Sequence, residues 1–215
     1  MAERPTSRLR NLLKGPDLIS APGVADALNA RLVAQAGFKA IYMTGAGTSA
    51  VRLGVPDIGL LTMHEMVDNA GRIAEASGLP LIADADTGYG GPINVRRTIQ
   101  AYERAGVAGV HIEDQQWPKR CGHLAGKTLI PTEEMSAKIK AAVDARMDDD
   151  FVVIARSDAL AVEGFDAVMA RGKAYEEAGA DIIFIEAPRD MDQLRQIPEA
   201  FDVPTLYNLA SSGKT

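Results

Sequence analysis

Seven short apolar segments recur along the chain, and each is dense in hydrophobic residues instead of alternating with polar ones. They lie near residue 18 (LISAPG) and at 36–44, 78–86, 105–113, 149–158, 178–186 and 202–208. Dense apolar runs of this length are typical of strands that are covered on both faces. Helical patterns separate them; one begins with a capping box formed by Thr62 and Glu65. The pattern predicts alternating strands and helices.

Three of these segments repeat one another. They read AGFKAIYMT (36–44), AGVAGVHIE (105–113) and AGADIIFIE (178–186). In each copy a glycine precedes the apolar run, at Gly37, Gly106 and Gly179. Glycine adopts the left-handed conformation that commonly ends a helix at little cost. Each copy therefore predicts a helix end followed by a strand.

Parallel strands joined by helices form either a closed (β/α)8 TIM barrel or an open doubly wound sheet. No dinucleotide fingerprint supports the open sheet, because GAG at 45–47 is followed by TSA. We therefore expect an α/β fold in which residues 1–215 form a single TIM-barrel catalytic domain. The pattern lacks the eighth strand of such a barrel.

Charge and composition limit the classes of partner. Lys and Arg number 23 against 29 Asp and Glu, a formal net charge of −6, so the basic footprint of nucleic-acid or anionic-membrane binding is missing. One cysteine cannot form an intrachain disulfide, and no apolar run is long enough to span a bilayer. Residues 1–15 lack the apolar core of a signal peptide and predict a surface helix. We expect a cytoplasmic protein with a small soluble partner.

Polar residues stand where six of the predicted strands end, at the barrel face that carries the chemistry in TIM-barrel enzymes. One such residue alone is as often a helix cap, but six consecutive strands end this way. Crowded carboxylates need a compensating cation, and oxygen ligands without cysteine or paired histidines favour Mg²⁺ or Mn²⁺. Arginine among them suits a compact polycarboxylate or phosphonate. The residues are Tyr42, Thr44, Asp84, Asp86, Glu113, Asp114, Arg156, Asp158, Glu186 and Asn208.

The only cysteine, Cys121, lies in the basic, glycine-containing loop PKRCGHLAGK (118–127). Lys119, Arg120 and His123 should lower the thiol pKa from roughly 8.5, which suits proton transfer near neutral pH. The alternative is a small buried hydrophobic residue. His64, in a predicted helix, and His111, inside a predicted strand, are interpreted as ordinary satisfied or solvated imidazoles.

Six motifs occur in order: PGVADALNARLVAQAGFKAIYMTGAG, DADTGYG, HIEDQ, KRCGH, ARSDA and FIEAP. Together they resemble the isocitrate lyase and phosphoenolpyruvate mutase superfamily, and they are most similar to its methylisocitrate lyase branch. KRCGH is the specific element, because the lyases carry a K-[KR]-C-G-H loop that the phosphonate mutases lack. The resemblance covers nearly the whole chain.

The resemblance implies a Mg²⁺-dependent carbon–carbon lyase that cleaves a 2-hydroxy tricarboxylate such as 2-methylisocitrate to pyruvate and succinate. Cys121 would be the proton donor in a loop with Lys119 and His123, and Tyr42 or a nearby carboxylate such as Glu113 would be the base. Asp84 would touch the metal, and Asp57, Asp86 and Glu113 would reach it through waters. Substrate would be held by Thr44, Gly45, Ala46, Gly122, Arg156, Glu186 and Asn208.

Several alternatives stay open. A 2,3-dimethylmalate-type lyase or an oxaloacetate decarboxylase would share the metal and most of the ring, whereas a phosphonate mutase would lack the cysteine loop. A barrel that binds a dicarboxylate without turnover is a further alternative. Phe184 stands where isocitrate lyases tend to carry a bulkier tryptophan, although it is also a routine inward-facing barrel position. The resemblance also implies a homo-oligomer, a tetramer with C-terminal helices exchanged between subunits. Because the eighth strand and these helices are missing from the pattern, we expect this chain to be C-terminally incomplete.

Overall fold

The computed structural model describes residues 3–122, 124 and 126–210. Its seven strands form one parallel sheet in which each strand pairs with the next, in the order β1 to β7. The strands are β1 (Gly23–Val24), β2 (Ile41–Met43), β3 (Leu81–Asp84), β4 (Gly109–Glu113), β5 (Val152–Ser157), β6 (Ile182–Ile185) and β7 (Thr205–Leu206).

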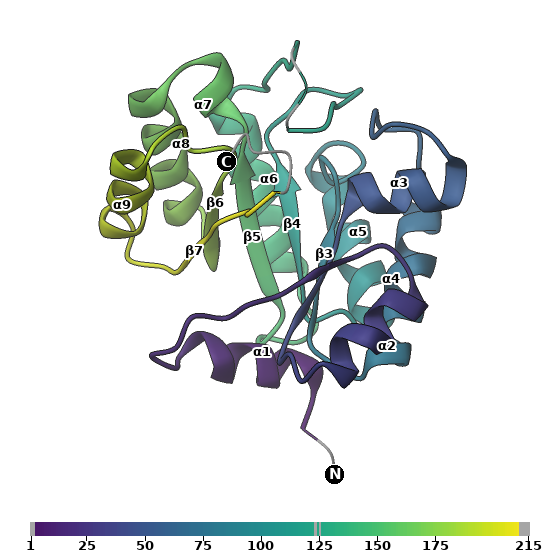
Figure 1. Cartoon of the computed structure of the whole chain (residues 1–215). Helices are drawn as coiled ribbons and strands as arrows, with labels where there is room; N and C mark the ends of the chain where they lie inside the picture. The colour runs from purple at the N-terminus through teal and green to yellow at the C-terminus, as the bar shows by residue number, and fades with distance from the viewer. Residues whose placement is uncertain (1–2, 123, 125, 211–215) are drawn as a thin grey trace.

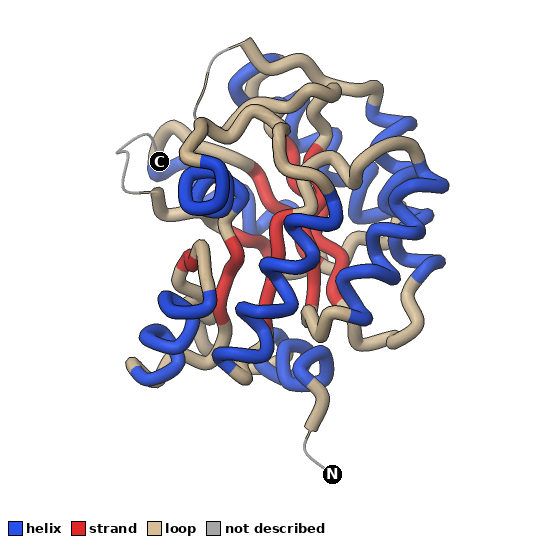
Figure 2. The backbone as a smooth tube through the Cα atoms, turned by 90° about the vertical axis from the view of Figure 1, so that its right-hand side faces the viewer, coloured by secondary structure: helices blue, strands red, loops and turns tan. Residues whose placement is uncertain are grey.

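Helices alternate with the strands and cover the outside of the curled sheet (Figures 1 and 2). They are α1 (Pro5–Leu13), α2 (Ala27–Gln35), α3 (Gly45–Leu53), α4 (Met63–Ser77), α5 (Pro92–Arg104), α6 (Thr132–Ala145), α7 (Ala159–Val162), α8 (Phe165–Glu177) and α9 (Met191–Ala200).

The strand order confirms the barrel-type prediction. A doubly wound sheet reverses its strand order at a switch point, whereas this sheet runs through β1 to β7 without reversal. The part of the chain that the structure describes contains seven strands of this curled α/β sheet and no eighth.

The structure confirms the helix ends that local sequence signals predict. Gly37, Gly106 and Gly179 adopt φ of 87°, 82° and 100°, the left-handed conformation that glycine tolerates best. The capping box is also present, because the Thr62 side chain accepts from the Glu65 amide and the Glu65 carboxylate accepts from the Thr62 amide. These residues set where the chain enters α4 and where it leaves a helix for β2, β4 and β6.

The first strand begins later than the apolar pattern predicts. The ladder starts at Gly23, and Leu18 is 96% exposed. Pro22 has no amide hydrogen and cannot donate to a ladder, although its carbonyl accepts from the Tyr42 amide at 3.1 Å. Proline thus delays the strand to the residues that follow it.

Helix α1 is a surface helix, as predicted, and one of its faces forms the floor of the barrel. It lies across the end of the sheet where the strands begin (Figure 1). Leu9 is fully buried in an inner cluster, and Arg10 pairs with Asp181 at 2.8 Å. The other buried members of this cluster are Ile82, Ala108, Val152, Ile154, Ile182 and Phe184.

A second, larger apolar cluster fills the layer between the strands and the outer helices, and it includes Val95, Ile99 and Tyr102 of α5. With the floor closed by α1, the polar strand ends and their loops gather at the opposite, carboxyl end. No helix in the described ranges has the length and apolar character needed to cross a membrane.

We expect Leu9→Ala to destabilise the fold by about 2–5 kcal/mol, because it leaves a cavity in the inner cluster. Leu18→Ala is the matched control, since this side chain is 96% exposed and should change stability by no more than about 0.5 kcal/mol. Urea unfolding followed by circular dichroism measures both variants. Equal effects of the two substitutions would contradict the role of α1 as the floor.

Candidate functional site

Strand pairing brings charged side chains from β4, β5 and β6 together at the carboxyl end of the sheet. Glu113 lies opposite Arg156 in the β4–β5 ladder. The Nε of Arg156 is 3.5 Å from Glu113 Oε2, and its Nη2 is 3.6 Å from Glu186 Oε2. Asn208 donates to Glu186 Oε1 at 3.5 Å. All but Asn208 are buried, so these groups interact in a medium of low dielectric.

Asp84 ends β3 and contacts the start of α3. Its Oδ2 accepts from the Gly45 amide at 3.1 Å and its Oδ1 from the Asp86 amide at 2.8 Å. A Cβ on Gly45 would lie 2.3 Å from Asp84 Oδ2, so only glycine fits there. Thr44 caps the helix by accepting from the Gly47 amide at 3.2 Å. The amides of Gly45 and Gly47 thus have partners within the protein.

Lys119 neutralises two buried carboxylates. Its Nζ lies 2.6 Å from Asp57 Oδ1 and 2.6 Å from Asp86 Oδ1, and the residue is 2% exposed. Burial would lower the pKa of Lys119, but the carboxylates of Glu113, Asp84, Asp86 and Asp57 raise it above its ordinary value. Lys119 therefore stays protonated.

The carboxyl groups differ in their proton affinity. Burial raises the pKa of Glu113 well above its ordinary value, against the lowering effects of Arg156 and Lys119. Burial, only partly offset by Lys119, also raises the pKa of Asp86, to about 6. For Asp84 burial acts in the same direction, but His111 and Lys119 outweigh it and the pKa is lowered. The site therefore pairs a firmly ionised Asp84 with a Glu113 that binds a proton more readily.

The loop that carries Cys121 docks directly on this cluster. The Cys121 amide donates to the Asp57 carbonyl at 3.0 Å, and the residue is half-buried. A Cβ on Gly122 would lie 2.3 Å from Arg156 Nη2, so the loop backbone packs against the guanidinium. Lys127 donates to the Gly122 carbonyl and to Asp158 Oδ1, the latter at 3.1 Å. His123 lies outside the described residues.

Asp158 and Asp114, two further strand-end residues, serve as supports. Asp158 accepts from Arg156 Nε at 3.1 Å and from Nη2 at 3.2 Å, which fixes the guanidinium plane. Asp114 accepts from Ser157 Oγ at 2.6 Å and from Tyr175 OH at 2.9 Å. Asp114 therefore ties β4 to β5 and α8, and its Oδ1 also accepts from the Asp158 amide at 3.0 Å.

His111 is a neighbour of the site that sequence reasoning set aside. Its ring stacks on Tyr42 with centroids 5.5 Å apart and meets Phe184 edge-on at 5.9 Å. Its Nε2 lies 3.3 Å from Asp84 Oδ1, and neither ring nitrogen makes a hydrogen bond to the described residues. The imidazole is thus fully buried, with the Asp84 carboxylate as a close polar neighbour. Its position two residues before Glu113 on one strand was the available signal, since such residues share a face.

Tyr42 is a weak candidate for a base that acts as a phenolate. Burial and the nearby Asp84 carboxylate raise the pKa of Tyr42 well above its ordinary value. The phenol therefore stays protonated near neutral pH and is suited to donate a hydrogen bond.

The carboxylate oxygens of the site fit a Mg²⁺ ion that keeps several water ligands better than an ion coordinated only by side chains. No group of three or more His, Cys, Asp or Glu within the described ranges is arranged to hold a metal directly. However, Glu113 Oε1 is buried and has no hydrogen-bond partner among the described residues. Mg²⁺ usually takes one or two carboxylates and completes its coordination with water and substrate. Asp84, Asp86, Asp57 and Glu113 offer oxygen donors of that kind.

Comparisons with known proteins agree with this geometry. The family model described as phosphoenolpyruvate phosphomutase matches residues 9–214. The chain is 50% identical over 209 residues to 2,3-dimethylmalate lyase of Eubacterium barkeri, covering 97% of the chain and 72% of the relative. It is 46% identical over 208 residues to 2-methylisocitrate lyase of Shewanella oneidensis, covering 97% and 71%.

Solved structures show the same likeness. Oxaloacetate acetylhydrolase with the inhibitor 3,3-difluorooxalacetate superposes with a TM-score of 0.95 at 46% identity, covering 98% of this chain and 73% of that one. Phosphonopyruvate hydrolase with oxalate and Mg²⁺ has a TM-score of 0.85 at 37% identity, covering 94% and 71%. The chain therefore belongs to the phosphoenolpyruvate mutase and isocitrate lyase superfamily.

Proposed function

We propose that this carbon–carbon lyase cleaves 2-methylisocitrate to pyruvate and succinate with the help of Mg²⁺. The observation that carries the proposal is the docking of the Cys121 loop on Asp57 and against Arg156. That contact brings the sole thiol of the chain to the buried charges that would hold a polycarboxylate. The similarity to named lyases, at 46–50% identity, supports the same reaction class.

Substrate binding would rest on Arg156, which is buried and oriented by Asp158. A guanidinium held in this way suits one carboxylate of the substrate. The Ala46 amide, at the amino-terminal end of α3, would receive a second carboxylate. The remaining proposed contacts are Thr44, Gly45, Ala46, Gly122, Glu186 and Asn208.

Asp84 would hold the metal directly, while Asp57, Asp86 and Glu113 would do so through water, with Mn²⁺ as a substitute for Mg²⁺. When bound, the ion would neutralise negative charge that develops on the substrate oxygens during cleavage. The structure of the related phosphonopyruvate hydrolase with oxalate and Mg²⁺ supports the choice of a divalent ion.

The protein groups would move two protons. Glu113 takes the proton of the 2-hydroxyl group, with Tyr42 as a hydrogen-bond donor beside it, and the carbon–oxygen bond becomes the carbonyl of pyruvate. The electron pair of the broken carbon–carbon bond remains on the other fragment, where Cys121 Sγ–H protonates it to give succinate. Lys119 keeps Asp57 and Asp86 in place through its two contacts of 2.6 Å, and His123 is the proposed cationic neighbour of the thiol.

A 2,3-dimethylmalate lyase is the second candidate, favoured by the 50% identity to the named enzyme. Its products would be pyruvate and propionate. Phe184 is buried beneath Arg156, with the Cζ of the guanidinium 5.2 Å from the ring centroid. Its size therefore affects the floor of the site, although one methyl group in an apolar pocket changes specificity by only about 1–3 kcal/mol.

We also propose that the protein acts in the cytoplasm as a homo-oligomer, a tetramer by family likeness. The acidic net charge and the single cysteine support the compartment. Apolar side chains exposed on α2 and α3 support the association, because clustered apolar surface marks interfaces. They are Leu28, Leu32, Val51 and Leu53.

A substrate panel tests the proposed reaction. We expect pyruvate from 2-methylisocitrate, with a smaller kcat/KM for 2,3-dimethylmalate and for oxaloacetate, when the protein is incubated with Mg²⁺. Lactate dehydrogenase coupled to NADH reports the pyruvate, and chromatography separates succinate, propionate and oxalate. Faster turnover of dimethylmalate would select the second candidate, and no turnover of any carboxylate would leave a binding protein.

Cys121→Ser should lower kcat by about 10²–10⁴-fold, because a serine hydroxyl is a much weaker acid at the position of the proton donor. Binding of pyruvate and succinate, measured by calorimetry, should change little and serves as the internal control. Iodoacetamide should label the native chain once and the variant not at all. Unchanged turnover in the variant would remove the thiol from the mechanism.

Gly45→Ala should weaken divalent-ion binding about 10–100-fold, because the new Cβ collides with Asp84. Electron paramagnetic resonance of free Mn²⁺ measures the affinity without any turnover. Gly91→Ala is the matched control, since a Cβ at this cap of α5 would meet no described atom within 4 Å. Equal Mn²⁺ affinity in both variants would show that Asp84 is not a ligand.

A further inference from the structure

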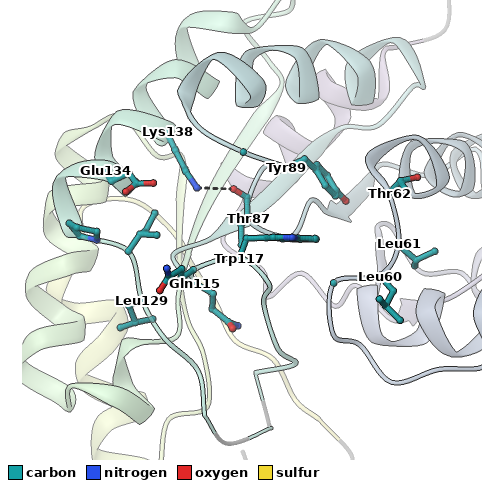
Figure 3. Close-up of a pocket in the computed structure, with 15 residues that line it drawn as sticks. Leu60, Leu61, Thr62, Thr87, Tyr89, Gln115, Trp117, Leu129, Glu134 and Lys138 are labelled. Atoms are coloured by element: carbon teal, nitrogen blue, oxygen red, sulfur yellow. Dashed lines mark hydrogen bonds between the residues drawn. The ribbon is translucent and has the colours of Figure 1, made fainter.

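A cavity of about 630 Å³ lies beside the candidate site but is separate from it. Its described lining includes none of Asp84, Arg156 and Cys121. The walls come from the segments 59–62, 87–90, 115–117 and 129–131 and from α6 (Figure 3). A volume of this size is typical of small-molecule sites.

A buried amine reaches this cavity. Lys138 of α6 is 4% exposed, and its Nζ donates to the Thr87 carbonyl at 3.3 Å (Figure 3). No carboxylate in the described ranges lies within 4.0 Å of that nitrogen, although an ammonium group has three donors. Burial lowers the pKa of Lys138, opposed by Glu134 at the rim. An anion beside Lys138 would supply the missing partner.

The opposite wall is apolar and aromatic. Trp117 and Leu60 line the cavity and remain 48% and 56% exposed. Tyr89, Leu129 and Ile130 extend this surface. Apolar walls around one charged group are the usual composition of a site for an amphipathic small molecule.

The cavity also lies at both ends of the loop that carries Cys121. The Gln116 amide donates to the Thr128 carbonyl at 2.8 Å, and Gln115 pairs with Leu129 in an antiparallel bridge. The Gln115 side chain then donates to the Arg120 carbonyl at 2.7 Å. A molecule held between these segments would contact the base of the loop.

We propose that this cavity is a second binding site, for a compact monocarboxylate with an aromatic or branched apolar body. The carboxylate pairs with Lys138, and the apolar body packs against Trp117 and Leu60. The choice of an anion follows from depth, because Lys138 is buried whereas Glu134 is exposed at the rim, where solvent screens its charge. Occupancy stiffens the two ends of the loop at 115–117 and 129–131.

Fluorescence of Trp117, the only tryptophan in the chain, tests the proposal without any substrate. We expect phenylacetate to change the emission saturably, and 2-phenylethanol and phenethylamine to bind at least about tenfold more weakly, since each lacks the anion. Lys138→Met should weaken phenylacetate binding by at least about tenfold. Lys140→Met is the matched control on the same helix, because Lys140 pairs with Asp144 in solvent and does not line the cavity.

A second variant covers the case in which Lys138→Met fails to fold. Leu60→Asp changes an exposed wall residue, so the fold should persist while a new negative charge repels phenylacetate. The proposal is overturned by an absence of saturable change in the native chain, by equal binding of phenethylamine, or by phenylacetate binding that neither Lys138→Met nor Leu60→Asp weakens. These measurements do not depend on the lyase reaction, so a failure of this proposal can be distinguished from a failure of the proposed function.

Discussion

The structure depends on two buried cations that offset a concentration of carboxylates at the carboxyl end of the sheet. Lys119 lies between Asp57 and Asp86, and Arg156 lies between Glu113, Asp158 and Glu186. Unpaired charges in such surroundings are strongly unfavourable, and removing one partner of a buried pair typically costs about 3–5 kcal/mol. These acids stay buried because each cation is shared among several of them. Burial raises the pKa of Glu113 in spite of these cations, whereas His111 and Lys119 lower the pKa of Asp84. The site therefore contains two carboxyl groups that differ in proton affinity.

Strand pairing determines which charges meet. The β4–β5 ladder sets Glu113 opposite Arg156, and the β5–β6 ladder sets Arg156 opposite Phe184. The inner cluster, closed by Leu9 of α1, fixes the lower part of the same strands. A shift of one residue in any of these ladders would turn the charged side chains toward the outer helices. The same strand register therefore positions both the apolar floor and the polar cluster.

The features that could be predicted from the sequence are those set by residues close to one another in the chain. Helix ends were predicted to within a few residues from Gly37, Gly106 and Gly179 and from the capping box at Thr62. The dense apolar runs predicted the strands in the same way. The strand-end acids could be grouped by the same logic, because parallel strands end at one edge. The pairing of Lys119 with Asp57 could not, since 62 residues separate them and only the fold brings them together. His111 was missed because a histidine within an apolar strand carries no local sign of its neighbours, and the cavity at Lys138 was missed because its walls come from four separate segments.

The charge balance also constrains how the Cys121 loop can move. Lys119 belongs to that loop, so a displacement that carries residue 119 outward removes the cation from Asp57 and Asp86. Lys127 at the other end would leave Asp158 in the same motion. Two carboxylates left behind in a low-dielectric site repel each other, and they must then gain a proton or another cation. Asp86 can take up such a proton, because burial already raises its pKa to about 6. The position of the loop and the protonation of these carboxylates are therefore coupled. A cation that reaches Asp57 and Asp86 competes with Lys119 for the same oxygens.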